Sequence, residues 1–97
     1  LNMSYQVSQG NFNPAINYVD VAGSFNDWEG TQLDLVENDI YSLVVSDISP
    51  GDSLAFKFRI DGDWNNAEFP GGGANRIYEV IQGENILEFW YNDEGGI

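Results

Sequence analysis

The chain has 97 residues, of which 42% are hydrophobic and 14% aromatic, so it is long enough for one domain with a single apolar core. Sixteen acidic residues oppose three basic ones, and this net charge of −13 argues against binding to nucleic acid or to an anionic membrane surface. The absence of cysteine and histidine excludes disulfides, thiolate zinc sites and the Ser-His-Asp and Cys-His catalytic systems. No apolar run reaches the length that a bilayer-spanning helix needs.

The acidity itself has two interpretations. It is typical of a soluble protein, and we expect this one to be extracellular or on the cell surface. Clustered oxygen ligands also bind calcium, and Asp34, Glu37, Asn38 and Asp39 come close to such a cluster. Because no EF-hand pattern is present, we predict neither a metal site nor a cofactor.

Alternation of apolar and polar residues predicts short strands along most of the chain. Turn signals separate them, the strongest being Ser49–Asp52 and Asp61–Gly62. We expect a monomeric, all-β, antiparallel immunoglobulin-like β-sandwich of seven or eight short strands, spaced by about 8–12 residues. In chain order these strands fall near residues 3–7, 18–23, 33–35, 40–46, 54–60, 76–81 and 86–91.

Strand 54–60 gives the clearest assignment of faces. Phe56 and Phe58 point toward the core, whereas Lys57 points the other way. In the last strand Leu87, Phe89 and Tyr91 fit the inner face and leave Trp90 outside. The same alternation predicts a core that includes Val19, Val21, Leu43, Phe56, Phe58, Ile60 and Phe89.

Two tryptophans stand in polar surroundings, Trp28 in the loop GSFNDW and Trp64 just after the Asp61–Gly62 turn. Each indole either folds back as a lid over the core or stays open as a flat platform. A flat indole with a polar rim suits the apolar face of a pyranose ring, whose hydroxyl groups need hydrogen-bond partners.

Two further features lie near these tryptophans. Lys57, the only lysine, is either a solvated strand residue or a donor to a ligand. The glycine-rich stretch 71–76 is not a phosphate loop, since no lysine or helical pattern follows it, and permissive turning explains it. Asn75, at the exit of that stretch, is placed to direct an amide toward a ligand over Trp64.

Three segments together resemble the starch- and glycogen-binding modules: 19–28 (VDVAGSFNDW), 56–64 (FKFRIDGDW) and 75–78 (NRIY). These are carbohydrate-binding module families 20 and 48, the latter including the glycogen-binding domain of the AMP-activated kinase β subunit. The resemblance covers residues 18–91. In these families two tryptophans stack on adjacent glucose rings while a lysine and an asparagine bond the sugar, which implies that Trp28, Trp64, Lys57 and Asn75 bind carbohydrate here.

The resemblance implies non-catalytic binding of α-1,4-glucan by a module of residues 1–97 from a larger protein. The expected partner is an α-glucan, and the expected tether is a glycoside hydrolase or a surface glycan-capture protein. A structural spacer domain and binding of a different polysaccharide remain alternatives. A glycosidase with two carboxylates is disfavoured, because a small sandwich lacks the cleft that raises a carboxyl pKa.

Overall fold

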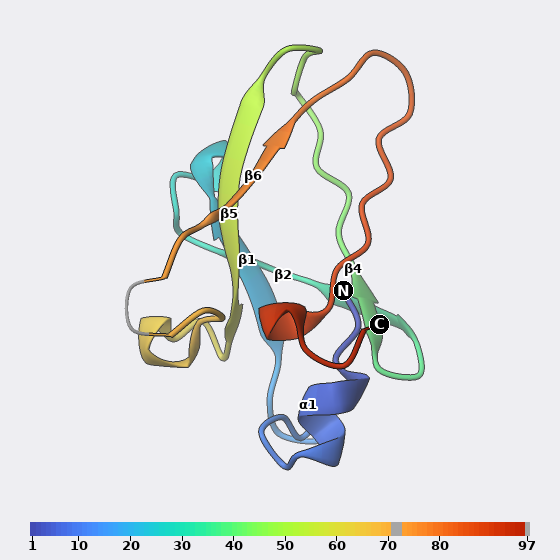
Figure 1. Ribbon diagram of the computed structural model, residues 1–97, viewed down its shortest axis with the longest axis vertical. Coiled ribbons are helices and arrows are strands. Elements are labelled where there is room, and N and C mark those ends of the chain that lie inside the picture. Colours follow the sequence, from blue (N-terminus) through green and yellow to red (C-terminus); the bar gives the residue numbers. More distant parts are fainter. Residues whose placement is uncertain (71–72, 97) are drawn as a thin grey trace.

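The computed structural model describes residues 1–70 and 73–96 as two antiparallel sheets that face each other, with one short helix at the end near the termini (Figure 1). One sheet has four strands in the order β2-β1-β5-β6, and the other is the hairpin β3-β4. The strands are β1 (Val19–Gly23), β2 (Thr31–Gln32), β3 (Asp34–Glu37), β4 (Ile40–Ser42), β5 (Ser53–Ile60) and β6 (Arg76–Glu79). The helix is α1 (Ser4–Ser8), and three 3₁₀ turns are η1 (Ser24–Asn26), η2 (Trp64–Asn66) and η3 (Tyr91–Asp93).

Strand β5 is a central strand of the larger sheet, between β1 and β6. It pairs with β1 so that Val21 lies opposite Phe58, and with β6 so that Leu54 lies opposite Tyr78. The ring of Phe58 packs against Phe56 and Phe89 with centroids 5.9 and 5.8 Å apart. All seven predicted core residues belong to this core or pack against it, Leu43 and Phe89 being only partly buried.

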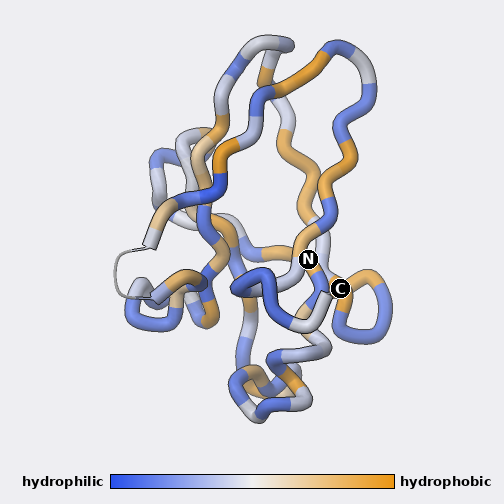
Figure 2. The backbone as a smooth tube through the Cα atoms, in the orientation of Figure 1, coloured by the Kyte–Doolittle hydropathy of each residue, from blue (hydrophilic) through white to orange (hydrophobic). Residues whose placement is uncertain are grey.

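The β-sandwich class is confirmed, but the described residues form six strands rather than seven or eight. The predicted strand 40–46 shortens to β4, and the predicted strand 86–91 does not form. Figure 2 shows that these two segments carry hydrophobic residues, so the expected pattern is present. A strand also requires a backbone partner, and segment 86–91 has only one bridge, between Asn2 and Trp90. Leu87, expected inside, is 39% exposed, whereas Tyr91 is buried.

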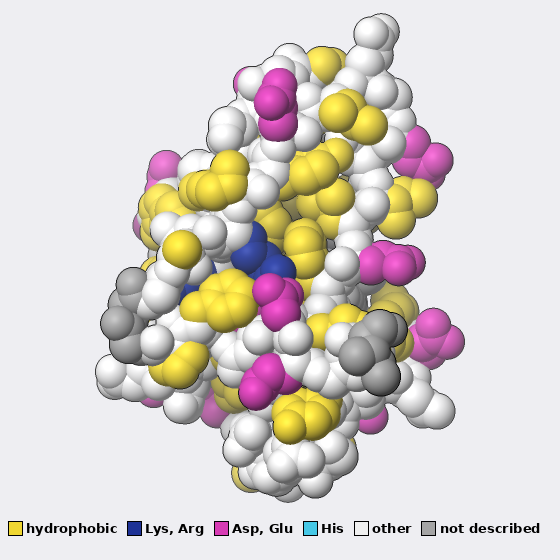
Figure 3. Space-filling model, in the orientation of Figure 1, with side chains coloured by type: hydrophobic (Ala, Val, Ile, Leu, Met, Phe, Trp, Pro, Cys, Tyr) yellow, Lys and Arg dark blue, Asp and Glu magenta, His cyan; other side chains and the backbone are white. Residues whose placement is uncertain are grey.

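Between the two layers a cavity of about 160 Å³ remains where these strands were expected. Its lining is largely apolar and includes Phe25, Leu43, Leu54, Leu87 and Phe89. In the space-filling view hydrophobic side chains surround a hollow in the upper half of the molecule (Figure 3).

The alternation at residues 3–7 was wrongly interpreted as extended. Helix α1 forms there, with hydrogen bonds from Val7 N to Met3 O and from Gln9 N to Tyr5 O, both of 3.0 Å. Met3 and Val7 are four residues apart and therefore also share one helix face, so a run this short fits either period. The residues buried in the structure are Met3 and Gln6, at a helical spacing of three, rather than the alternate set Met3, Tyr5 and Val7 that a strand would bury.

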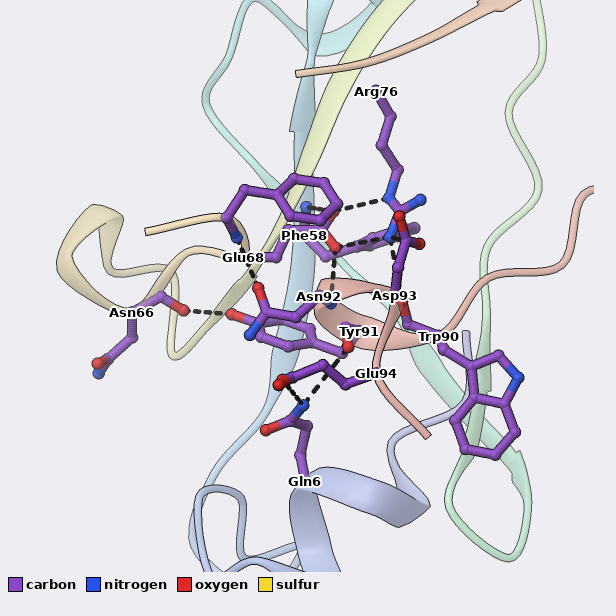
Figure 4. Close-up of polar contacts among 11 residues, drawn as sticks. Gln6, Phe58, Asn66, Glu68, Arg76, Trp90, Tyr91, Asn92, Asp93 and Glu94 are labelled. Carbon is purple, nitrogen blue, oxygen red and sulfur yellow. Dashed lines mark hydrogen bonds and ion pairs between the residues drawn. The ribbon is translucent and has the colours of Figure 1, made fainter. Parts of the chain in front are cut away.

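The tail 93–96 is packed against the domain. Asp93 forms an ion pair with Arg76, and Gln6 donates to Glu94 Oε1 at 2.9 Å (Figure 4). The backbone of Gly95 and Gly96 lies against the Trp90 ring, where an added Cβ would come within 3.0 Å of it. Trp90 therefore lies half-buried beneath the tail.

Candidate functional site

The candidate site lies on the outer face of the larger sheet, opposite the core. Because side chains alternate along β1 and β5, Asp20, Ala22, Lys57 and Arg59 lie on this face, and all four are buried. Two segments reach it from opposite ends of the antiparallel pair β1–β5: the loop 24–30 after β1 and the turn 61–66 after β5. Each of them carries one tryptophan.

The loop with Trp28 is closed by its own polar groups. The Asn26 side chain accepts a hydrogen bond from Gly23 N and donates one to Val21 O, both at 2.9 Å. Trp28 N donates to Gly23 O at 2.9 Å, and Asp27 and Trp28 adopt left-handed conformations, with φ of 55° and 62°. A left-handed tryptophan is strained, and this loop accepts the strain while leaving the indole half-buried.

Trp64 opens the turn η2 immediately after strand β5. The Asp63 side chain caps this turn by accepting a hydrogen bond from Asn65 N at 2.8 Å. At the other end of the turn, the Tyr91 hydroxyl donates to the carbonyl of Asn66, which ties η2 to the core. Trp64 itself remains 51% exposed.

The structure brings the two predicted tryptophans together. Their ring centroids are 6.3 Å apart and their planes are inclined by 39°. Neither residue belongs to the core or packs against it. The interpretation of each indole as a lid over the core is therefore not supported, and the pair forms an inclined aromatic surface outside the sheet.

Lys57 is on the predicted face but is not solvated. The residue is 6% exposed, and Nζ donates a hydrogen bond of 2.8 Å to the carbonyl oxygen of Gly73. The interpretation of Lys57 as a solvated strand residue is therefore wrong, because alternation assigns a face but does not reveal that a loop covers it. Lys57 secures the loop that leads into β6.

Asn75 is exposed on that same loop, two residues after Gly73. Its neighbours Gly71 and Gly72, part of the predicted glycine-rich stretch, lie outside the described residues. The loop begins after Glu68 and ends at Arg76, and these two residues form a buried ion pair with nitrogen and oxygen 2.8 Å apart. The base of the loop carrying Asn75 is thereby fixed to the sheet.

The sequence reasoning missed the pair Asp20 and Arg59, which lies beneath the tryptophans. Arg59 donates from Nε to Oδ1 of Asp20 at 3.0 Å and from Nη2 to Oδ2 at 2.6 Å. This hydrogen bonding raises the pKa of Arg59, outweighing the opposing effect of its burial. The signal was a pair of opposite charges facing each other across β1 and β5, which is visible only once the register is known.

Residues 3–79 match the family described as carbohydrate-binding module 48, the isoamylase N-terminal domain. The chain belongs to carbohydrate-binding module family 48. The matched range includes Trp28, Lys57, Trp64 and Asn75, and it begins and ends earlier than the range 18–91 that the resemblance covers. No curated protein and no solved structure matches this family 48 module.

Membership of family 48 identifies the chain as a carbohydrate-binding module. Within the described residues, no group of three or more acidic side chains is arranged to hold a metal ion, at 34–39 or elsewhere. The same part of the chain contains no helix with the length and apolarity to cross a membrane.

Proposed function

We propose that this module binds α-1,4-linked glucans (starch, glycogen and maltooligosaccharides) through the Trp28–Trp64 pair without catalysing a reaction. The observation that carries the proposal is the pairing of the two indoles outside the core, with Trp64 half exposed. Two flat apolar rings inclined to each other match successive glucose units of a curved chain better than two coplanar rings would.

The polar rim supports the same assignment. Asn75 is exposed and has the donors and acceptor of an amide for sugar hydroxyl groups. Lys57 lies beneath the loop that carries Asn75 and acts by holding it, with its remaining ammonium protons directed to the ligand when one is bound. Neutral glucose units also avoid the repulsion that this strongly acidic chain would exert on an anionic polysaccharide.

An open aromatic surface with few buried hydrogen bonds gives modest affinity, on the order of micromolar to millimolar. Such a module is effective as part of a larger assembly, where it raises the local concentration of its partner at the polymer. We propose that it acts as a monomer at the cell surface or outside the cell, tethered to a glycoside hydrolase or a glycan-capture protein.

Electrophoresis through gels containing soluble starch tests the function directly. The wild-type protein should be retarded, and Trp64→Ala should migrate as it does in a gel without starch. Trp90→Phe is the matched control, because Trp90 packs beneath the C-terminal tail, away from the proposed site. Equal retardation of wild type and Trp64→Ala would contradict the proposal, and retardation by a β-1,4-glucan instead of starch would reassign the linkage.

A further inference from the structure

Arg59 contacts both tryptophan-bearing segments at once. Its Cζ lies 4.6 Å from the ring centroid of Trp64, which places the guanidinium over one face of the indole. Its Nη2 also points to the carbonyl oxygen of Glu29, the residue after Trp28, at 3.4 Å. Arg59 is 5% exposed, and the two bonds to Asp20 fix it to the sheet.

The backbone of both segments closes tightly around this ion pair. A Cβ added at Gly30 would lie 2.2 Å from Nη2 of Arg59 and 2.3 Å from Oδ2 of Asp20. Gly30 also has a φ of +91°, so glycine is required there on both grounds. Gly62, with a φ of +64°, brings the second segment within reach of the same atoms.

We infer that Arg59 is the positioning residue of the glucan platform, holding Trp28 and Trp64 at their mutual angle from beneath. Only a guanidinium can do this, because it stacks through its flat face while its edge donates several hydrogen bonds in one plane. Asp20 takes two of those bonds, and the Glu29 carbonyl completes the link to the other segment.

Two consequences follow for the bound sugar. Arg59 occupies one face of Trp64, so a glucose ring stacks on the opposite face. The indole is also ordered before the ligand arrives, which lowers the entropy cost of binding at a site with few hydrogen bonds.

A second buried ion pair gives a matched comparison. Arg76 donates to Glu68 from Nε and Nη2 at 2.9 and 2.8 Å (Figure 4). Its Cζ lies 4.5 Å from the ring centroid of Phe89. Like Arg59 it is doubly bonded to a carboxylate and stacked on an aromatic ring, and only 10% of its side chain is exposed. Its other described hydrogen-bond and ion-pair partners, Asp93 and the Trp90 carbonyl, belong to the C-terminal segment rather than to the two tryptophan-bearing segments.

The expected change in glucan affinity rests on the proposed function, whereas the expected change in indole arrangement does not. The test therefore has two readouts. The first is the circular dichroism couplet of the contacting indoles in the ligand-free protein, assigned by its loss in Trp28→Phe. The second is maltoheptaose affinity from fluorescence titration. Arg59→Lys should abolish the couplet and weaken affinity about tenfold or more, whereas Arg76→Lys should lower the melting temperature while keeping the couplet and reducing affinity much less.

An Arg59→Lys protein that keeps both the couplet and the affinity would overturn the inference. If that variant does not fold, the double variant Asp20→Leu/Arg59→Met removes both buried charges together and should fold without the couplet. Failure of the wild-type protein to bind maltoheptaose would overturn the proposed function instead. The couplet of the ligand-free variants would then still decide the positioning role of Arg59.

Discussion

Phe58 and Arg59 are neighbours on β5 but lie on opposite faces of the sheet. Both are buried, with 6% and 5% of their surface exposed. Phe58 packs among aromatic rings and stabilises the fold, while Arg59 is buried under polar loops and orders the tryptophans. Burial alone therefore does not separate a core residue from a site residue; the identity of the covering groups does.

The largest expected effect comes from the inner face. Phe58→Ala should lower the free energy of unfolding by about 3–5 kcal/mol, because it removes a buried ring and leaves a cavity. Urea denaturation followed by circular dichroism measures this change. At temperatures where the variant is folded, its affinity for maltoheptaose should match that of the wild type, and a large loss of affinity would break the division between the faces.

The second effect concerns the outer face of the sheet, where a substitution should reduce affinity and leave stability nearly unchanged. Trp28→Ala should weaken maltoheptaose binding by roughly 1–3 kcal/mol, by analogy with the loss of one aromatic platform for a nucleobase. Its free energy of unfolding should change little, since Trp28 does not pack against the core. Isothermal titration and thermal melting of the same sample test both halves. Intact binding with a collapsed melting temperature would show that Trp28 is a structural lid.

Lys57 tests the boundary between the two faces. Lys57→Met keeps the aliphatic stem but removes the bond to Gly73 O, so it should lower the free energy of unfolding by about 0.5–1.5 kcal/mol and weaken glucan binding moderately. Asn75→Ala is the comparison, because it removes an exposed amide and should reduce affinity with no loss of stability. If Lys57→Met binds as tightly as the wild type, Lys57 is a structural residue only.

The smallest effect is a pH dependence at the contact between the core and the turn of Trp64. Burial raises the pKa of Tyr91 above its ordinary value of 10.0, with a smaller contribution from Glu68. The folded state thus keeps the hydroxyl protonated, and the stability it contributes is complete below about pH 10 and falls as the pH rises above that value. Tyr91→Phe, which cannot titrate, should lose stability less steeply in urea melts above about pH 10. Parallel pH profiles for the two proteins would argue against this assignment.

Local sequence was sufficient for the parts of the site that lie within one turn or loop. The GSFNDW loop is closed by Asn26 three residues after Gly23, and Trp64 follows a turn that the Asp61–Gly62 pair predicts. Their approach to 6.3 Å is a property of the tertiary structure, because β1 and β5 are antiparallel and the two segments leave the pair at opposite ends. The resemblance, rather than any local pattern, implied that the two tryptophans act together.

The predictions that were wrong or incomplete concern residues whose partners are distant in the sequence. Segment 86–91 has the alternation of a strand but no ladder partner. Residues 3–7 fit a helix and a strand equally until packing buries Gln6 together with Met3. Lys57 was placed on the correct face, but its cover is a loop sixteen residues away. Asp20 and Arg59 are thirty-nine residues apart, a separation at which no local pattern pairs two charges.

The sequence by itself therefore determined the β class, the inner-face residues and the identity of Trp28, Trp64, Lys57 and Asn75 as candidates, because periodicity and turn chemistry act over a few residues. The tertiary structure decided which strands form, which outer residues are covered and how the indoles are held. Those outcomes depend on register and loop packing, which bring together groups that no local spacing connects.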